Sequence, residues 1–476
     1  MLLRQVFDDH LAQYAYLIGC QQTREALIID PERDVDRYVD LAAAEDLTIT
    51  AVAETHIHAD FVSGARELAA RHDVMVYVSD EGGPDWKYTW VGEPGIRHRL
   101  LKDGDTFTIG NIELTAKHTP GHTPEHLSYV ILDRGGAADE PMGLATGDFV
   151  FVGDVGRPDL LETAAGVAGA MRPAAQRLLG SVRAFLDLPD YLQIWPGHGA
   201  GSACGKALGA IPTSTVGYER RFNDAIRLAG EKDEAFLQAI LHGQPEPPLY
   251  FARMKRVNKE GPPVLGALPS PPTLDVESAR EVVRRQGVLI DARGDRDAFM
   301  RAHPAGALFA PLDRTFPTVV GSYVEPGHPI HLILDPLCAD MAVRDLIRIG
   351  LDDIAGIVPP QVADEVAADP TFSRTIETTD FAGLARLRDR PGTTVLDVRR
   401  RTEFDEGHVP DALNISHTRL LSRLGEVPHG GQVIVHCRSG ARAATAVALL
   451  ARHGFQAVLV DDEFSNWPSP AAVQIP

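Results

Sequence analysis

The chain has 476 residues, of which 44% are hydrophobic, and a formal net charge of −20. At roughly 150 residues per domain, this length predicts about three domains, and the apolar content is sufficient for their cores. The acidic balance argues against a nucleic-acid or anionic-membrane partner, because both bind clustered lysine and arginine.

The spacing of the cysteines and the lengths of the apolar runs indicate the cellular compartment in which the protein is expected. The four cysteines lie far apart, which argues against a disulfide framework and fits a reducing cytoplasm. The first residues include acids where a signal peptide needs an unbroken apolar stretch. No apolar run approaches the ~18 residues of a membrane span. We therefore expect a soluble, cytoplasmic protein without a membrane partner, and the sequence leaves a homo-oligomer open.

The first domain, which we place at residues 1–244, alternates short β-branched segments with segments whose apolar residues recur at helical spacing. Histidine, aspartate and glycine gather where the strand-like segments end. The pattern therefore indicates an α/β fold. The expected strands cover residues 25–30, 48–55, 74–79, 112–119, 127–132 and 192–198, and the expected helices cover residues 34–47 and 171–188.

Four segments of this domain carry residues suited to metal binding. Residues 55–64 read THIHADFVSG, which places His56, His58 and Asp60 at alternate positions. Loops at strand ends can present ligands to one point, and imidazole with carboxylate suits zinc, iron or manganese. The other three candidates are His122 in TPGHTPEH, Asp148 in TGDFVF and His198 in PGHG.

Residues 245–272 contain eight prolines, a density that argues against regular structure and predicts a linker. An internal repeat follows, in which VLIDARGDRDAF aligns with VLDVRRRTEFDE and Asp291 matches Asp397. In each copy, a second apolar strand and a helix come later. The repeat predicts two copies of a small α/β domain, at residues 273–368 and 375–476.

The second copy contains HCRSGARAA, in which Cys437 lies between an apolar strand and a helix. Such a loop can turn its backbone N–H groups inward at the helix N-terminus and bind an anion. Arg438 and Arg442 add positive charge, so the loop favours a reactive thiolate over an inert buried cysteine. The remaining loop residues, which we assign to substrate binding, are Ser439, Gly440 and Ala441.

The ordered set of His, Asp and Gly motifs in the first domain resembles the metallo-β-lactamase fold, which implies an αβ/βα sandwich. Dinuclear members of that family usually read His-x-His-x-Asp-His, and Phe61 stands at the last position here. A phenyl ring cannot bind a metal. Asp60 and His198, with Asp148 as a bridge, would hold a second ion poorly, so we infer one metal per chain.

Within that fold, the chain resembles the persulfide dioxygenases, whose single iron is bound by residues that match His56, His122 and Asp148. His58 lies nearby in sequence as a fourth or outer ligand. Two histidines and one carboxylate with open positions form the ligand set of non-haem Fe(II) oxygenases. The resemblance therefore implies Fe(II), with zinc as the alternative.

The same resemblance suggests further site residues. Arg157, in VGDVGRPDL, is expected to bind the carboxylate of a thiol carrier, the alternative being an ion pair with a neighbouring aspartate. Tyr218 is a second substrate-binding candidate. Asp60 and His198 are candidates for orienting the metal ligands. Cys204 either relays sulfur or is a small residue in a glycine-rich turn.

The second copy of the repeat resembles rhodanese. Its Cys-x4-Arg spacing differs from the Cys-x5-Arg of related phosphatases and implies a sulfane sulfur carried on Cys437. In the first copy Pro336 stands where the nucleophile is expected. We therefore interpret residues 273–368 as an inactive rhodanese-like domain, and Cys338 as a small packed residue.

The whole chain resembles fusions of a persulfide dioxygenase with two rhodanese repeats. This implies oxidation of a low-molecular-weight persulfide, of the glutathione or coenzyme A type, by O2 to sulfite. The rhodanese step would transfer sulfur between persulfide or thiosulfate and thiol or sulfite, with sulfide detoxification as the role. The thiol carrier and the direction of the transfer stay open.

Two other functions stay open at this point. A zinc thioester hydrolase similar to glyoxalase II would share most of the metal ligands, although Phe61 argues against it. In a non-enzymatic alternative, the two repeats act as a sulfur sensor or scaffold.

Overall fold

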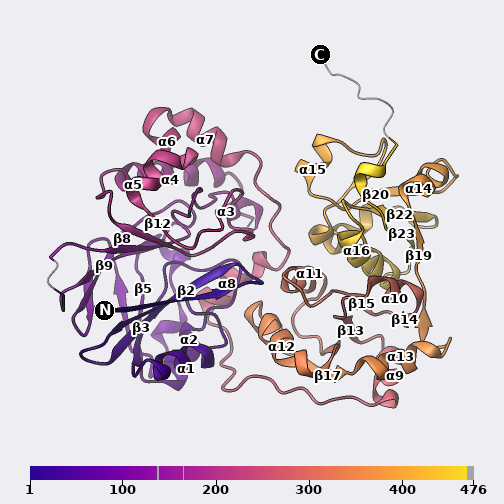
Figure 1. The fold of residues 1–476 in the computed structure, drawn as a ribbon, viewed down its shortest axis with the longest axis horizontal. Helices are drawn as coiled ribbons and strands as arrows, with labels where there is room; N and C mark the ends of the chain where they lie inside the picture. Colours follow the sequence, from indigo (N-terminus) through magenta and orange to yellow (C-terminus); the bar gives the residue numbers. More distant parts are fainter. Residues whose placement is uncertain (137–138, 165, 469–476) are drawn as a thin grey trace. The chain divides into compact units, whose positions relative to one another are not determined.

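The computed structural model describes residues 1–136, 139–164 and 166–468, and it divides into two compact units (Figure 1). The first unit comprises Met1–Leu268 with Ile347–Gly350, and the second comprises Pro269–Leu346 with the chain from Leu351 onward. Residues 469–476 of the predicted last domain lie outside the described residues. No helix in the described ranges has the length and apolar character that a membrane-spanning segment requires.

Two six-stranded sheets form the centre of the first unit in the described part of the chain. Large apolar side chains from both sheets, such as Ile18, Leu27, Tyr129 and Trp195, share one buried cluster, so the sheets pack face to face. The first sheet has the order β1 (Leu2–Asp8), β2 (Gln13–Cys20), β3 (Glu25–Ile29), β4 (Thr48–Ala53), β5 (Met75–Ser79) and β6 (His98–Leu101). The second has the order β12 (Ser214–Thr215), β11 (Gln193–Pro196), β10 (Gly143–Gly147), β9 (Leu127–Asp133), β8 (Ile112–His118) and β7 (Thr106–Ile109).

Helices cover the outer faces of the two sheets. Tyr38 and Leu68 join the cluster on the first sheet, and Leu178 and Ile226 join the cluster on the second. The layers are therefore helix, sheet, sheet and helix, which confirms the αβ/βα sandwich predicted from the sequence. The helices are α1 (Asp36–Ala44), α2 (Ala65–Arg71), α3 (Leu160–Thr163), α4 (Met171–Phe185), α5 (Val216–Phe222), α6 (Asp224–Glu231) and α7 (Asp233–Leu241).

The proline-rich segment is not devoid of regular structure, which corrects one expectation. Helix α8 (Phe251–Glu260) occupies the proline-free stretch between Pro248 and Pro262. Phe251, Met254 and Asn258 recur at helical spacing and are buried, with exposures of 3%, 0% and 2%. Proline excludes a helix only where it stands, and this interval holds nearly three turns. The helix belongs to the first unit.

The second unit contains two mainly parallel sheets within the described residues. One has the order β15 (Leu308–Phe309), β13 (Val288–Asp291), β16 (Ile330–Ile333) and β17 (Ile354–Val358). The other has the order β21 (Leu413–Asn414), β20 (Thr394–Asp397), β22 (Gln432–His436), β23 (Gln456–Val460) and β19 (Glu377–Thr379). In both sheets, the first four strands in these orders are the second, first, third and fourth of the four along the chain, as an internal repeat requires.

The remaining elements of the second unit connect and cover these sheets. A short antiparallel pair joins β14 (His303–Pro304) and β18 (Ser373–Arg374). The helices are α9 (Val276–Arg284), α10 (Arg296–Arg301), α11 (Phe316–Tyr323), α12 (Ala339–Arg348), α13 (Pro360–Ala368), α14 (Phe381–Leu387), α15 (Arg401–Glu406) and α16 (Ala441–Arg452). The assignment of residues 273–368 as an inactive rhodanese-like domain stays a prediction.

Candidate metal centre and sulfur-transfer site

Three of the predicted metal ligands come together at the strand ends of the first unit. His56 follows β4, His122 lies between β8 and β9, and Asp148 follows β10 directly. One ligand atom from each lies within 4.8 Å of the others, and all three residues are buried. Nε2 of His122 and Oδ2 of Asp148 are 3.4 Å apart. The sheets thus bring together ligands that are far apart in the sequence.

The free atoms of this group face one another. Among the described residues, Nε2 of His56, Nε2 of His122 and Oδ2 of Asp148 are buried without a hydrogen-bond partner. Such orphaned polar atoms are costly unless something binds them. Burial lowers the pKa of His122 and, together with the neighbouring imidazoles, holds the pKa of His56 well below its ordinary value. Both rings are therefore neutral, the form that binds a metal, so the residues fit a metal ion.

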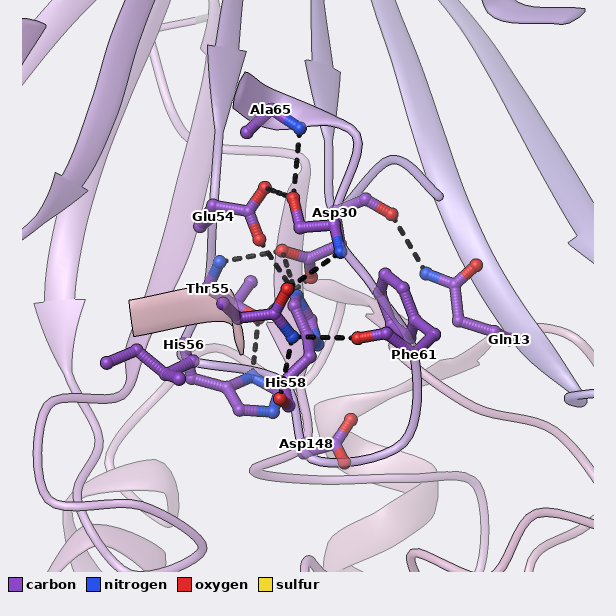
Figure 2. Close-up of polar contacts among 12 residues, drawn as sticks. Gln13, Asp30, Glu54, Thr55, His56, His58, Phe61, Ala65 and Asp148 are labelled. Carbon is purple, nitrogen blue, oxygen red and sulfur yellow. Dashed lines mark hydrogen bonds and ion pairs between the residues drawn. The ribbon is translucent and has the colours of Figure 1, made fainter. Parts of the chain in front are cut away.

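Hydrogen bonds to the second ring nitrogens orient both imidazoles. Nδ1 of His122 lies 3.1 Å from the carbonyl oxygen of Arg157 and donates to it. Nδ1 of His56 lies 2.9 Å from the Thr55 hydroxyl, which donates to Asp30 at 2.8 Å (Figure 2). Outer contacts of this kind fix the tautomer and aim Nε2 at the metal position. Asp30, which directly follows β3, was missed from the sequence; its place at a strand end was the available signal.

His58 belongs to a different group. Its Nε2 lies 3.2 Å from Asp30 and 3.0 Å from Glu54, and these three residues form a separate buried cluster (Figure 2). Burial lowers the pKa of His58, but the two carboxylates outweigh it and raise the pKa well above its ordinary value. The ring of His58 lies beside that of His56, with centroids 4.2 Å apart, but its Nε2 faces Asp30 and Glu54, and its role as a fourth or outer ligand stays a prediction.

Phe61 packs beside this cluster and is fully buried. Its ring centroid lies 4.3 Å from that of His58. The loop that carries both residues is held by Asn258 of α8, which donates to the carbonyl oxygens of His58 at 2.8 Å and Phe61 at 2.7 Å. The side-chain oxygen of Asn258 also accepts from the Ser63 N–H at 2.9 Å. Asn258 was missed because its segment was interpreted as a linker.

A further buried group joins Asp60, His198 and Cys204, whose ligand-type atoms lie within 4.8 Å of one another. Nε2 of His198 lies 3.1 Å from Asp60 and 3.5 Å from Asp148, and its Nδ1 lies 3.1 Å from the carbonyl oxygen of Ala12. Burial, with Asp60 and Asp148 nearby, raises the pKa of the Cys204 thiol to about 12. Cys204 is therefore a buried neutral thiol beside the metal group, in contrast to a reactive thiolate.

Two predicted substrate-binding residues are placed elsewhere. Arg157 is only 1% exposed, and its guanidinium donates to both carboxylate oxygens of Asp159, at 2.7 and 2.6 Å, and to the carbonyl of Ala203. This is the ion pair with a neighbouring aspartate that the sequence left as the alternative, and it uses three of the five guanidinium N–H donors within the protein. Tyr218 is 52% exposed, and its ring lies against Phe222. It is not among the described residues that line a pocket beside His122.

The rhodanese-type loop lies in the second unit. Cys437 directly follows β22 and is buried, while Arg438 and Ser439 are exposed. Gly440 adopts φ +82, a left-handed conformation that favours glycine, and Ala441 begins helix α16. The strand, the tight turn and the helix N-terminus are thus arranged as the sequence predicted, and anion binding by the loop stays a prediction.

Charged contacts hold this loop from outside. Arg442 forms two hydrogen bonds with Glu403, at 2.6 and 2.8 Å. Burial lowers the pKa of Arg442, but Glu403 and Cys437 outweigh it and raise the pKa above its ordinary value. From helix α10 of the preceding repeat, Arg296 donates to the carbonyl oxygen of Ser439 at 3.2 Å, a contact the repeat alignment did not predict.

The corresponding position of the first repeat differs. Pro336 begins a short 3-10 helix, Pro336–Cys338, before α12. Cys338 is exposed, so its interpretation as a packed residue was wrong. Proline supplies no N–H to an anion-binding turn, which explains why this segment takes another shape.

Comparisons with known proteins give matches for both parts of the chain. A model of the metallo-beta-lactamase superfamily matches residues 8–198, and a model of the rhodanese-like domain matches residues 381–469. The chain is 27% identical over 237 residues to a mitochondrial persulfide dioxygenase of Bos taurus, covering 49% of this chain and 78% of that protein. It is 29% identical over 295 residues to a beta-lactamase hydrolase-like protein of Xylella fastidiosa, covering 56% and 61%.

One solved structure covers more of the chain. It is a metallo-beta-lactamase from Staphylococcus aureus, 43% identical, with a TM-score of 0.69. The match covers 76% of this chain and 99% of that one.

Proposed function

Because the chain belongs to the metallo-β-lactamase superfamily and carries a C-terminal rhodanese-like domain, we propose that it oxidises a low-molecular-weight persulfide with O2 and couples this step to sulfur transfer. Its relatives make it an enzyme of the metallo-hydrolase and persulfide dioxygenase family that uses a metal cofactor and acts on small sulfur compounds. The specific substrate, the iron and the sulfite product are the parts we propose.

The observation that carries the proposal is the group of His56, His122 and Asp148, on a chain that also has the Cys437 loop. Two imidazoles and one carboxylate leave coordination positions open, which is the ligand set of non-haem Fe(II) oxygenases. Iron bound there would supply the activation of O2. The buried apolar ring of Phe61 supports one metal, because it stands where a dinuclear site needs a ligand.

The proposed reaction balances as RSSH + O2 + H2O → RSH + SO3²⁻ + 2H⁺. The sulfur–sulfur bond breaks, the terminal sulfur is oxidised to sulfite, and O2 is the oxidant. His56 and His122 enter as neutral ligands oriented by Thr55 and by the carbonyl of Arg157. Nε2 of His198 lies 3.5 Å from the second carboxylate oxygen of Asp148 and 3.1 Å from Asp60.

In the rhodanese-like domain, we propose that the Cys437 sulfur attacks the outer sulfur of a persulfide or of thiosulfate. A new sulfur–sulfur bond forms on Cys437 while the thiol or sulfite leaves, and a second acceptor then takes the sulfur. The N–H groups at the start of α16 and the guanidinium of Arg442 are the groups available to bind the anionic acceptor or leaving group. Glu403 keeps Arg442 in place.

Oxygen uptake by the iron-loaded full chain tests the first step. We expect uptake with glutathione persulfide or coenzyme A persulfide and the formation of sulfite in equal amount. Absence of uptake with both would refute the proposed oxidation. The variant Cys437→Ser is expected to lose sulfur transfer to sulfite while retaining oxygen uptake, which separates the two sites and also excludes a purely non-enzymatic repeat.

Metal content discriminates between oxidation and thioester hydrolysis. We expect one iron per chain after expression in iron-containing medium. Two zinc ions per chain, with hydrolysis of a glutathione thioester, would instead favour the hydrolase alternative. The group of Asp60, His198 and Cys204 makes this measurement informative, because it is where a second ion would bind.

A further inference from the structure

A pocket lies beside the metal group and is lined in part by helix α8. The pocket is a small hollow open to solvent, with a cavity volume of about 20 Å³, and His122 is one of its lining residues. Most of the wall is apolar and comes from four separate segments of the first unit. An apolar wall with a few polar groups and a metal ligand on one side is the usual lining of a small-molecule site. The principal apolar residues are Ile57, Trp86, Leu160, Leu161 and Phe251.

Lys255 is the positively charged side chain among the described lining residues. Its Nζ lies 3.7 Å from the centroid of the Trp86 ring, and no carboxylate in the described ranges forms an ion pair with it. Partial burial lowers the pKa of Lys255, and the carboxylates of Glu125 and Asp85 offset part of this effect. A half-buried ammonium group without a direct counter-ion is costly, so an anion bound beside it is stabilised.

Resting on the proposed function, we propose that the carrier part of the persulfide packs against the apolar wall of this open pocket and that Lys255 binds an anionic group on that carrier. The group is a carboxylate or a phosphate. With the carbon skeleton against the apolar wall, the sulfur lies on the side of His122, where the metal group is. The chain has a net charge of −20, so a local cation is needed to attract an anionic substrate.

The placement of Arg157 strengthens this assignment. Its guanidinium is buried, and three of its five N–H donors already bind Asp159 and a backbone carbonyl, so it is poorly placed to bind the carrier. Lys255 lines the pocket, and no carboxylate among the described residues forms an ion pair with its ammonium group. The anion-binding role expected of Arg157 therefore passes to a residue of α8.

Direct binding tests the proposal without any turnover. Calorimetry on the full chain as purified would use S-methylglutathione, which carries carboxylates, desulfo-coenzyme A, which carries phosphates, and neutral methylthioethanol. For at least one of the two anionic probes, we expect Lys255→Met to weaken binding about tenfold to a hundredfold, the loss typical of a hydrogen bond to a charged group. Lys255→Arg should restore most of the affinity, and methylthioethanol should not respond.

A matched control separates this contact from a general change of charge. Lys259 lies one turn further along α8 and does not line the described pocket, so Lys259→Met removes the same charge from the same helix. We expect it to leave probe binding within about twofold. Methionine at residue 255 keeps an unbranched apolar stem against Trp86, so loss of packing is also controlled.

The outcomes identify the anion and separate this proposal from the proposed function. If only the binding of S-methylglutathione depends on Lys255, the anionic group is a carboxylate. If only the binding of desulfo-coenzyme A depends on it, the group is a phosphate. Binding of neither probe, or equal binding by wild type and Lys255→Met, overturns the proposal. If binding depends on Lys255 but iron-loaded protein consumes no O2 with any persulfide, the oxidation fails while the pocket assignment stands.

Discussion

Replacing Asn258 by alanine removes the contact that fixes the metal-binding loop to helix α8. The Asn258 amide donates to the carbonyl oxygens of His58 and Phe61 and accepts from the N–H of Ser63, at 2.8, 2.7 and 2.9 Å. All four residues are buried, with Asn258 at 2% exposure. The substitution therefore leaves two carbonyl groups and one N–H group unsatisfied in a region that excludes water.

The expected cost follows from these three groups. An unsatisfied buried polar group costs about 1–3 kcal/mol, so three give an upper range of about 3–9 kcal/mol before any relaxation. Loop movement and entry of water reduce the sum, and we expect the free energy of unfolding of the first unit to fall by about 3 kcal/mol. That is a large part of the 5–15 kcal/mol typical of a domain. Metal retention should also weaken, because the loop begins at His56.

Tryptophan fluorescence during urea unfolding measures this loss. Trp86, Trp90 and Trp195 lie in the first unit, whereas Trp467 lies in the second, so the signal mainly reports the unit that contains Asn258. Circular dichroism reports the unfolding of both units, so comparing it with the fluorescence signal separates the transition of the first unit from that of the second. Competition with a chelator, measured on the same samples, reports metal retention.

The control variant is Lys259→Ala, next to Asn258 on the same helix, whose side chain makes none of these three contacts. Lys259 is only partly buried, and we expect the variant to change the free energy of unfolding by less than about 0.5 kcal/mol, as is usual for positions outside the core. If Asn258→Ala costs no more than this control and retains metal equally well, the reasoning that α8 holds the metal-binding loop is refuted.

Three other changes give separate tests. Asp148→Asn should abolish stoichiometric metal binding, measured by elemental analysis, with little change in circular dichroism, because it removes the charged ligand of the group. Arg157→Met should lower the free energy of unfolding by about 3–5 kcal/mol, because it leaves a buried carboxylate unpaired; a changed KM at unchanged stability would contradict this. Burial raises the pKa of Glu125 from 4.5 to about 7, so the folded state binds a proton that the unfolded chain releases, and stability should fall as pH rises from 4.5 through 7. Glu125→Gln should flatten that fall in urea titrations at several pH values, by up to about 1.4 kcal/mol per pH unit.

Local patterns in the sequence predicted an α/β first domain with candidate metal ligands at its strand ends, and the resemblance to known families implied the sandwich fold and the choice of three ligands. His56, His122 and Asp148 each follow or lie between apolar strands, and neighbouring strands end at a common edge, so short motifs were enough to place them among the candidates. The Cys437 loop is likewise a local unit of strand, tight turn and helix. Where the chemistry depends on the residue type and its immediate neighbours, one sequence was enough.

The directions of side chains and the partners from distant segments required the tertiary structure. His58 turns to Asp30 and Glu54, and Arg157 is buried against Asp159, although both carry the functional groups expected of a ligand and a substrate contact. A motif specifies which groups are available, whereas burial and the nearest counter-charge decide how each is used.

Helix α8 shows the same limit most clearly. The prolines on both sides of this segment predicted a linker. The tertiary structure shows that Asn258 contacts the metal-binding loop and that Lys255 lines the pocket. Asn258 and the carbonyl of His58 are separated by 200 residues in the chain. No periodicity or spacing relates residues so far apart, because their contact arises from the burial of apolar side chains such as Phe251 and Met254, which positions the polar face of the helix.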